Sequence, residues 1–468
     1  MTVIASIDEI VSDWEKRYRF IAMKDTNEIY YYEDGVYKSN GEKFVEILAE
    51  SELTGAKNHI ISEIVGKIRR RNYVDRDEIN GKSHILNFQN GLYNLETGEL
   101  MDHTPNHYST VQLPVKYDSS ANCTKITKFL GEIVTPKNIP LLEEVAGWTL
   151  WRDYVPHKAI MLLGGGRNGK STYVYLIERL LGEQNVSNVS LQDLTNDRFA
   201  SARLFGKAAN IYADLPDKDL LDTDAFKIAT GQDFMEAQEK FRQRFKFKNT
   251  AKLIYSANKL PMCRDDSRAF YARWVLIEFP FTFDTPERPA NSDLRDELTT
   301  AEEMSGFLNL ALDGLNRLRS NGWKFSYTMT AEDIEERYKR LSNPVYAFIM
   351  DRCEADPDGF EPKQKLYGAF KEYAAENNLR PVTEKKFGEL LLAQYEIPVT
   401  SVRPTSSYSG IRTYSWMGIK LRDDVQYVHR SNINTQKSEN DLGSKMVRKL
   451  DILDRFVEDD EFVWEGAL

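Results

Sequence analysis

One eight-residue segment limits the folds open to this chain more than any other. Residues 164–171 read Gly-Gly-Gly-Arg-Asn-Gly-Lys-Ser and fit the pattern G-x-x-x-x-G-K-[ST] at every fixed position. The apolar run AIMLL precedes this segment, and the helix-compatible run STYVYLIERLL follows it. Because a phosphate-binding loop joins a buried strand to a helix, this context predicts an α/β domain with a nucleoside triphosphate site.

The residue types in the loop suit phosphate binding. Glycines let backbone N–H groups approach phosphate oxygens without an obstructing Cβ atom, and the N-terminus of the following helix favours an anion. We expect Lys170 to face the β- and γ-phosphates and the Ser171 hydroxyl to coordinate Mg²⁺. A GTPase would need N-K-x-D, but the chain has proline at Pro261 in place of the aspartate. The predicted nucleotide-binding residues are Gly164, Gly165, Gly166, Arg167, Asn168, Gly169, Lys170, Ser171 and Thr172.

Two polar residues end apolar stretches downstream of the loop. Asp214 follows residues 208–213, and we expect it to hold Mg²⁺ or polarise water; a turn aspartate is the alternative. Asn258 follows residues 252–257, where its amide could position the attacking water or only cap a strand. The sequence therefore predicts a second part of the nucleotide site at these strand ends.

Arg273 opens the strand-like run WVLIEF. A guanidinium at a strand edge could reach the γ-phosphate of a neighbouring subunit and neutralise charge in the transition state. The alternative is a surface ion pair, and Arg268 competes for the same role. The predicted catalytic residues are therefore Lys170, Asp214, Asn258 and Arg273, with Ser171 and Asp214 as metal ligands.

A basic segment lies between the acidic and amide strand ends. Its cations alternate with aromatic residues, which places the two kinds on opposite faces of a predicted hairpin. Because neutralisation of phosphates supplies most sequence-independent affinity for nucleic acid, we expect the cationic face to bind DNA; an ordinary solvated face is the alternative. The cations are Lys240, Arg242, Arg244, Lys246 and Lys248, and the rings are Phe241, Phe245 and Phe247.

Composition excludes several classes of protein. The formal charge is −10, from 62 basic and 72 acidic residues, so DNA contacts must come from local basic patches. Three widely spaced cysteines argue against a disulfide framework and a zinc module. No apolar run reaches the roughly 18 residues of a membrane helix, and the N-terminus lacks the features of an export signal. These features predict a soluble, cytoplasmic protein.

Changes in pattern divide the chain into four parts. Residues 1–150 read as an N-terminal α+β/helical domain, which we expect to serve as a collar or oligomerisation domain. Residues 151–335 alternate buried strands with helices, which predicts a parallel sheet. Residues 340–422 show three helical patterns and then a polar strand pair, which predicts a winged helix; residues 423–468 read as a polar linker and an acidic tail. Lys385 and Lys386, on the third helix, could contact DNA, or the module could only pack against its neighbour.

The ordered set of motifs resembles the superfamily 3 helicases, which are AAA+-type ring motors of viruses and plasmids, and most of all the poxvirus-type and phage/plasmid primase–helicase family. The resemblance rests on EIYYYEDGVY, ILNFQNGLYNLETGEL, GGGRNGKST, ANIYADLP, FKIATGQDFMEAQEKF, FKFKNTAKLIYSANKLP and SRAFYARWVLIEFPFTF. The chain departs from the family at Ala213-Asp214, where paired acids are common, at Gln232 in the TGGD-like turn, and at Ala272-Arg273, where an arginine pair is common.

The resemblance implies a function and an assembly. It implies an AAA+ core, roles for Asp214, Asn258 and Arg273 as above, ATP with Mg²⁺, and a homo-hexameric DNA helicase that acts at replication of a virus, plasmid or integrated element. Few residues precede the shared region, so we expect a separate primase. The alternatives are a nucleic-acid-stimulated ATPase that remodels DNA or acts in defence without processive unwinding, and a non-catalytic loader.

Overall fold

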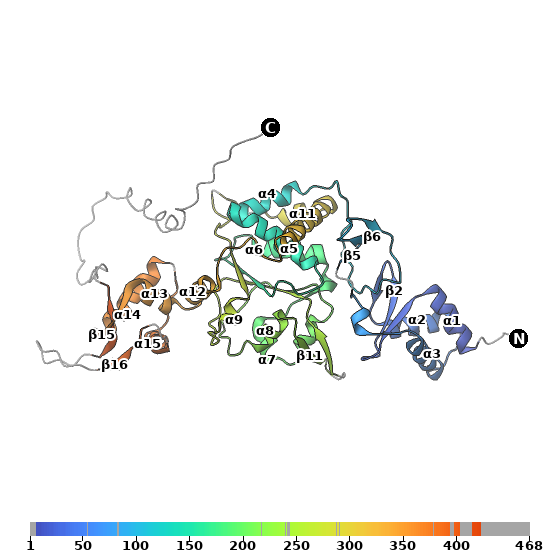
Figure 1. Cartoon of the computed structure of the whole chain (residues 1–468), viewed down its shortest axis with the longest axis horizontal. Coiled ribbons are helices and arrows are strands. Elements are labelled where there is room, and N and C mark those ends of the chain that lie inside the picture. Colours follow the sequence, from blue (N-terminus) through green and yellow to red (C-terminus); the bar gives the residue numbers. More distant parts are fainter. Residues whose placement is uncertain are drawn as a thin grey trace, which may run out of the picture.

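The computed structural model describes residues 6–53, 55–81, 84–216, 218–238, 240, 244–286, 288–289, 291–377, 379–393, 397–402 and 414–422. Three units follow one another along the long axis of the molecule (Figure 1). We call them the N-terminal unit (residues 6–81), the central unit (residues 84–342) and the C-terminal unit (residues 344–422). None of the helices in the described ranges is long and apolar enough to cross a bilayer.

The N-terminal unit packs three helices on a small sheet. The sheet order is β3-β2-β1-β4, with β4 parallel to β1 and the other pairs antiparallel. Helices α2 and α3 are separate because the chain turns between them at Gly55, whose φ is +71°. The elements are α1 (Ile7–Arg17), β1 (Phe20–Met23), β2 (Ile29–Glu33), β3 (Val36–Lys38), α2 (Gly41–Glu52), α3 (Asn58–Arg71), β4 (Tyr73–Val74) and the 3₁₀ helix η1 (Arg76–Glu78).

A short meander and two helices lead into the central sheet. Turns at Asn90-Gly91 and Thr97-Gly98 connect its strands. One hydrophobic cluster runs from Leu86 to Tyr338, so the predicted domain border at residue 150 falls inside this core. The elements are β5 (Ile85–Phe88), β6 (Gly91–Asn94), β7 (Leu100–Met101), α4 (Thr124–Ile133), η2 (Pro136–Asn138) and α5 (Ile139–Leu150).

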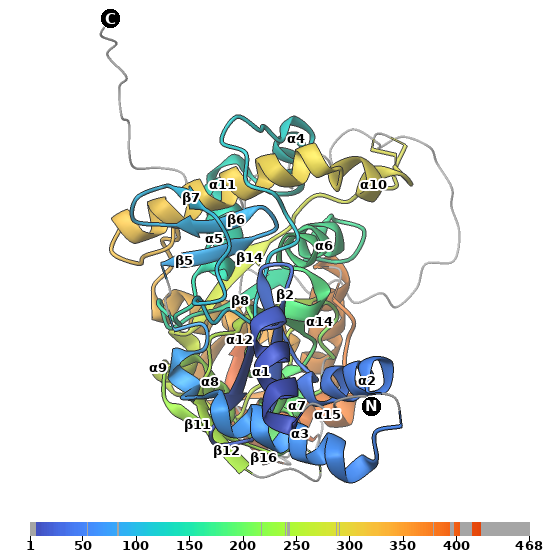
Figure 2. The same cartoon turned by 90° about the vertical axis from the view of Figure 1, so that its right-hand side faces the viewer.

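The central sheet is parallel, with the strand order β14-β8-β13-β10-β9. Figures 1 and 2 show α4, α5, α6 and α11 on one side of it and α7, α8 and α9 on the other. The elements are β8 (Ala159–Leu163), α6 (Lys170–Leu181), η3 (Glu183–Asn185), β9 (Val186–Ser187), α7 (Leu191–Asn196), η4 (Ser201–Leu204), β10 (Ala209–Tyr212), α8 (Asp224–Thr230), β11 (Phe234–Gln238), β12 (Arg244–Lys248), β13 (Lys252–Ala257), α9 (Arg268–Tyr271), β14 (Trp274–Glu278), α10 (Leu294–Leu298), α11 (Ala301–Ser320) and α12 (Ala331–Ser342).

Helices α5 and α11 approach closely behind the phosphate loop. A Cβ atom on Gly147 would lie 2.2 Å from the Ala311 oxygen, and one on Gly314 would lie 2.3 Å from the Glu143 oxygen. Across this contact, the fully buried Glu144 accepts a hydrogen bond of 2.8 Å from Arg317 Nε. The two glycines therefore let the helices approach closely, and charge-assisted hydrogen bonds from Arg317 to Glu144 and Glu143 join them.

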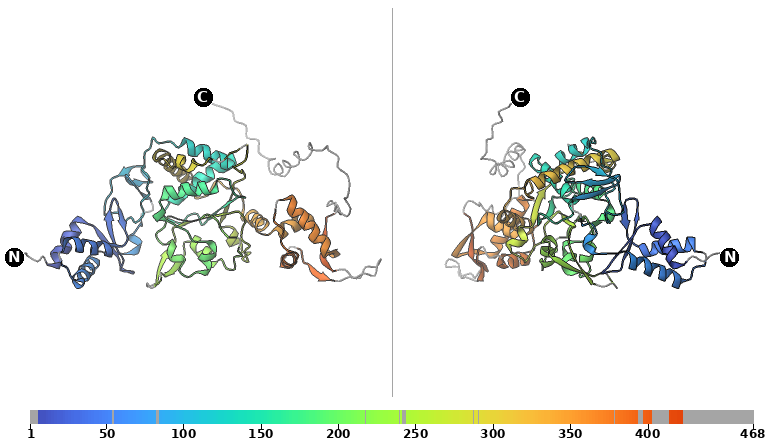
Figure 3. Two further views of the ribbon diagram at one scale, coloured as in Figure 1. Left: turned by 180° about the vertical axis from the view of Figure 1, so that it is seen from behind. Right: turned by 45° about the vertical axis from the view of Figure 1, so that its right-hand side comes forward.

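The C-terminal unit combines three helices with a three-stranded antiparallel sheet of order β15-β17-β16 (Figure 3). The sequence predicts the helices and two of the strands. The first helix ends at Arg352, and β15 follows it directly. The elements are α13 (Pro344–Arg352), β15 (Cys353–Pro362), α14 (Lys363–Glu376), α15 (Glu384–Ala393), β16 (Thr400–Val402) and β17 (Ser415–Leu421). The predicted linker and tail at 423–468 lie outside the described residues.

Candidate functional site

The phosphate-loop motif lies where the sequence predicts it, between β8 and α6. Gly169 precedes the helix with φ +86°, and a Cβ atom there would lie 2.3 Å from Ile133 Cγ2. A Cβ atom on Gly164 would lie 1.8 Å from Asn168 Nδ2. Around Gly165 and Gly166, by contrast, an added Cβ would meet no atom within 4 Å. Two glycines therefore shape the loop, and two leave open space beside its backbone.

Lys170 is held by neutral oxygen atoms. Its side chain is 5 % exposed, and Nζ donates to the Gly164 carbonyl at 2.7 Å, to Asn168 Oδ1 at 3.1 Å and to Asn258 Oδ1 at 3.3 Å. Burial lowers the pKa of the ammonium to about 8, against the opposing influence of the Asp214 charge. No carboxylate in the described ranges forms an ion pair with the Lys170 ammonium. It can therefore still form charge-assisted hydrogen bonds to an anion, which are stronger than those it makes to neutral oxygen atoms.

The ends of three neighbouring strands bring the predicted residues to one edge of the sheet. Strand β13 lies between β8 and β10, with Ala257 opposite Leu163. The two exposed polar residues follow directly: Asn258 is the first residue after β13, and Asp214 lies two residues after β10. The Leu215 N–H donates to the Ser256 carbonyl at 2.8 Å and ties these two strand ends together.

Ser171 and Asp214 are the two residues that the sequence predicts as ligands of Mg²⁺. Ser171 is exposed in the first turn of α6, and Asp214 is exposed at the same sheet edge. In the part of the chain that the structure describes, no three His, Cys, Asp or Glu side chains gather as a metal site. The two predicted ligands therefore stay predictions.

The structure adds contacts around the loop that no local motif signals. The Arg167 guanidinium pairs with the Asp284 carboxylate, and the Phe283 N–H donates to the Arg167 carbonyl at 2.7 Å. Asn168 donates to the Phe279 carbonyl at 3.3 Å while it accepts from Lys170. The segment after β14 thus braces the loop from more than 100 residues away.

Arg273 lies at the opposite edge of the sheet from Lys170. It immediately precedes β14, whose first residue, Trp274, pairs with Ala159 at the start of β8. Its Nε donates to Thr230 Oγ1 at 2.8 Å and its Nη1 to the Ala269 carbonyl at 2.5 Å. Five parallel residues at about 3.3 Å each separate the two edges by about 16 Å, so Arg273 does not reach the phosphate loop of its own chain.

The competing Arg268 is more exposed. Its side chain is 77 % accessible and forms an ion pair of 2.9 Å with Glu332 on α12. Arg273, in contrast, is half-buried, and this burial lowers its pKa although Asp233 and Asp265 oppose the shift. The choice between the two as the residue that acts in a neighbour stays a prediction.

The basic segment forms the predicted hairpin, β11 and β12. Glu236 pairs with Lys246 and Ala237 with Phe245 across the hairpin. The cations Arg244, Lys246 and Lys248 are exposed, whereas Phe247 is buried and Phe245 is half-buried. The predicted alternation is therefore confirmed for these residues. Lys240 is exposed in the connecting segment, and Arg242 and Phe241 lie outside the described residues.

The two lysines of α15 have different surroundings. Lys385 is exposed, whereas Lys386 is half-buried and lies 3.8 Å from Glu389. Lys386 also lines a cavity of about 570 Å³ between α15 and the central unit, together with Arg264 and Tyr338. The DNA role predicted for Lys385 and Lys386 therefore stays a prediction.

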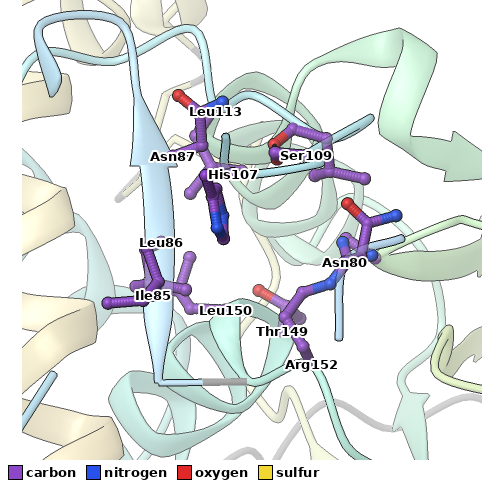
Figure 4. A pocket seen from close by; sticks show the side chains of 12 residues that line it. Asn80, Ile85, Leu86, Asn87, His107, Ser109, Leu113, Thr149, Leu150 and Arg152 are labelled. Atoms are coloured by element: carbon purple, nitrogen blue, oxygen red, sulfur yellow. Dashed lines mark hydrogen bonds between the residues drawn. The ribbon is translucent and has the colours of Figure 1, made fainter. Parts of the chain in front are cut away.

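A second cavity is too small for a nucleotide. It has a volume of about 20 Å³ and lies between β5, the segment 107–113 and the end of α5 (Figure 4). Arg152 lines it, and its buried Nη1 has no hydrogen-bond partner among the described residues. Since one water molecule needs at least about 10–15 Å³, the cavity has room for solvent and not for a substrate.

Comparison with known proteins gives two family matches. Residues 10–135 match the family described as "D5 N terminal like", and residues 162–273 match a family of unknown function, DUF5906. The second match covers the phosphate loop, both polar strand ends and Arg273.

Named relatives come from large DNA viruses. A "putative helicase" of Acanthamoeba polyphaga mimivirus is 23 % identical over 323 residues, which are 63 % of this chain and 33 % of that protein. A "putative helicase" of Frog virus 3 is 23 % identical over 256 residues, or 50 % of this chain and 26 % of that protein. A "putative primase" of African swine fever virus is 23 % identical over 326 residues, or 64 % and 34 %. The chain spans about a third of the length of the relatives it matches.

Among solved structures, the apo C-terminal region of NrS-1 is similar, with a TM-score of 0.47, 12 % identity, and coverage of 87 % of this chain and 97 % of that one. The A-form apo structure of the same region has a TM-score of 0.46 and 13 % identity. The "D5 N terminal like" match and the named viral relatives support the similarity of this chain to the phage and viral primase–helicase family.

Proposed function

We propose that the chain is an ATP-dependent DNA helicase of a virus, plasmid or integrated element, which unwinds DNA at replication as a homo-hexameric ring. The observation that carries the proposal is the position of the Lys170 ammonium, which contacts both the phosphate loop and Asn258 at the end of a second strand. Binding or loss of a phosphate group at the loop would therefore alter the contact of Lys170 with the end of β13, which is the strand that follows the basic hairpin.

The residues present fit ATP with Mg²⁺. Phosphate oxygens would give Lys170 the charged partner it lacks, and the open space at Gly165 and Gly166 admits them to the backbone. The Ser171 hydroxyl and the Asp214 carboxylate are oxygen ligands of the kind that Mg²⁺ takes. When bound, the ion would neutralise charge on the phosphates, while the Asn258 amide holds water beside Lys170.

The position of Arg273 supports a ring. An arginine that assists hydrolysis must reach the γ-phosphate, and Arg273 is held by Thr230 and Ala269 at the far edge of its own sheet. A second copy of the chain could bring its Arg273 to this phosphate, whereas the same chain cannot. In the sheet, β13 lies between β10 and β8, the strand that precedes the phosphate loop, and β14 lies on the other side of β8. This strand order is in keeping with an AAA+ core.

Two surfaces support binding of DNA. Arg244, Lys246 and Lys248 form one exposed row along β12, and residues two apart on a strand lie about 6.6 Å from each other. The C-terminal unit has the helices and antiparallel strands of a winged helix, with Lys385 exposed on its third helix. We propose that the row grips a single strand in the ring and that the C-terminal unit contacts duplex DNA.

The names of the relatives agree with this proposal. Two are called helicases and one a primase, and each name is that of a protein about three to four times as long as the matched region. We assign the helicase role to this chain because it carries both the phosphate loop and the basic hairpin. We propose that a separate primase supplies primers.

A strand-displacement assay on forked DNA tests the function. Wild-type protein with ATP and Mg²⁺ should release the labelled strand, and Lys170→Ala should not. Lys128→Ala, which removes only a highly exposed side chain on α4, serves as a control for handling. DNA-stimulated hydrolysis without displacement would contradict the helicase and favour the remodelling ATPase. Nucleotide binding without turnover would favour a non-catalytic loader.

A further inference from the structure

Arg76, in the N-terminal unit, lies between two aromatic rings of the central unit. Its Cζ atom is 4.2 Å from the ring centroid of Phe205 and 4.4 Å from that of Phe245. Phe245 belongs to β12, where its neighbours Arg244 and Lys246 point to the exposed face. Both distances are well inside the roughly 6 Å over which a guanidinium is attracted to a ring face.

The same guanidinium is fixed from the N-terminal side. Nε and Nη2 donate to the two carboxylate oxygens of Asp25 at 2.6 and 3.0 Å, and the Arg76 side chain is only 15 % exposed. A bidentate pair of this kind fixes the plane of the guanidinium as well as its position. Asp25 lies between β1 and β2, so the sheet of the N-terminal unit sets where Arg76 meets the rings.

The rings connect Arg76 to both strands of the hairpin. The centroid of Phe205 is 5.2 Å from that of Phe245 and 5.5 Å from that of Phe247, so the three rings form one cluster beneath β12. Strand β11 joins this cluster through η4, because Ser201 Oγ donates to the Glu236 carbonyl at 3.0 Å. Figure 1 shows the N-terminal unit beside the part of the central unit that carries β11.

We propose that Arg76 is a positioning residue for the DNA-binding hairpin. It holds the aromatic underside of the hairpin against the N-terminal unit, so that the exposed cations meet a polynucleotide as a fixed row. The inference rests on the proposed function, because it takes this row as the DNA contact. Arg76 itself contacts the opposite face from Lys246 and does not touch the polynucleotide.

This geometry predicts a specific pattern in DNA binding. A residue that only orders the row should lower affinity when removed, because binding must then order the hairpin, but it should leave the number of phosphates contacted unchanged. The dependence of affinity on salt measures that number. Removal of a contacting cation, in contrast, should lower both the affinity and the salt slope.

The binding experiment uses the full chain, a fluorescent oligothymidylate and a series of KCl concentrations. Arg76→Ala should weaken binding about fivefold or more with the slope unchanged, as expected for a coupling between two parts of a protein. Lys246→Ala should reduce the slope by about 0.7. Lys24→Ala, which breaks an exposed ion pair with Asp75 in the same unit, should change neither quantity. Arg76→Lys should regain part of the affinity, since it keeps the charge. Unchanged affinity in Arg76→Ala, or a slope lowered as in Lys246→Ala, would overturn the proposal.

Hydrogen exchange gives an arm that does not depend on DNA. Amides of residues 234–238 and 244–248 should exchange faster in Arg76→Ala than in the wild type, and at the wild-type rate in Lys24→Ala. Equal protection in all three proteins would contradict the positioning role. If the wild type binds no oligonucleotide, the proposed function fails, and the exchange data still decide whether Arg76 holds the hairpin.

Discussion

Binding of ATP should weaken as the pH rises through 8. Burial lowers the pKa of Lys170 to about 8, so its side chain is charged below that pH and neutral above it. Only the charged form offers phosphates an ammonium partner. The bound anion should therefore raise the pKa of Lys170, and nucleotide binding above pH 8 should take up a proton.

The size of the effect follows from the same value. A group with a pKa of about 8 is about 90 % charged at pH 7 and about 10 % charged at pH 9, so the affinity should fall about tenfold between these conditions. Tenfold corresponds to about 1.4 kcal/mol. The negative charge of Asp214 raises the pKa of Lys170 and so opposes the effect of burial. Asp214→Asn should therefore lower the pKa of Lys170 further and move the fall in affinity to a lower pH.

Titration calorimetry with a slowly hydrolysed ATP analogue, in two buffers of different ionisation enthalpy, measures both the affinity and the proton uptake. Lys170→Arg is the matched control, since arginine stays charged throughout this range and should give little dependence on pH. A wild-type affinity that is flat from pH 7 to 9 would refute the reasoning. An equal fall in Lys170→Arg would assign the effect to another group.

Three further predictions concern the DNA row, the helix contact and the phosphate loop. Lys246→Ala should leave ATPase without DNA intact and reduce DNA stimulation, measured as ATPase against oligonucleotide concentration; equal stimulation would argue against the row. Glu144→Gln should lower the free energy of unfolding by about 3 kcal/mol, because the hydrogen-bonded charge facing Arg317 is lost. Urea denaturation measures this free energy, and a loss below about 1 kcal/mol would contradict the prediction. Gly169→Ala should destabilise the protein by at least about 1–2 kcal/mol, because residue 169 has a positive φ, and it should abolish nucleotide binding. Gly165→Ala should melt like the wild type. Equal melting temperatures of the two variants would disprove the requirement for glycine at position 169.

Local pattern was enough for much of the fold. The bounds of β8 and β13 match the apolar runs in the sequence, because each of these strands places a continuous apolar run in the core. The loop motif also predicts the position of Lys170, and the place of Asn258 at the end of a parallel strand predicts that it lies near Lys170. In parallel sheets, strand ends of equal direction share an edge, so these contacts follow from order along the chain.

Other features depend on contacts that no local pattern records. Strand β15 reads EADPDGFEP in its interior, without alternation of apolar residues, and pairs with β17 across a bulge between Asp356 and Phe360. Arg76 meets rings more than 120 residues away, and the Arg167–Asp284 pair spans 117 residues. Lys386 carries the same charge as Lys385 but faces the central unit, a difference that only the packing of α15 determines.

A mixing experiment tests the shared ATP site most directly. Lys170→Ala keeps Arg273 but lacks the phosphate-loop lysine, and Arg273→Ala has the reverse defect. If one chain supplies the arginine to the site of the next, each variant alone should hydrolyse ATP slowly, and mixtures should regain activity as the ratio approaches one to one. Activity that never exceeds the sum of the separate variants, or full hydrolysis by a monomeric wild type, would contradict the account.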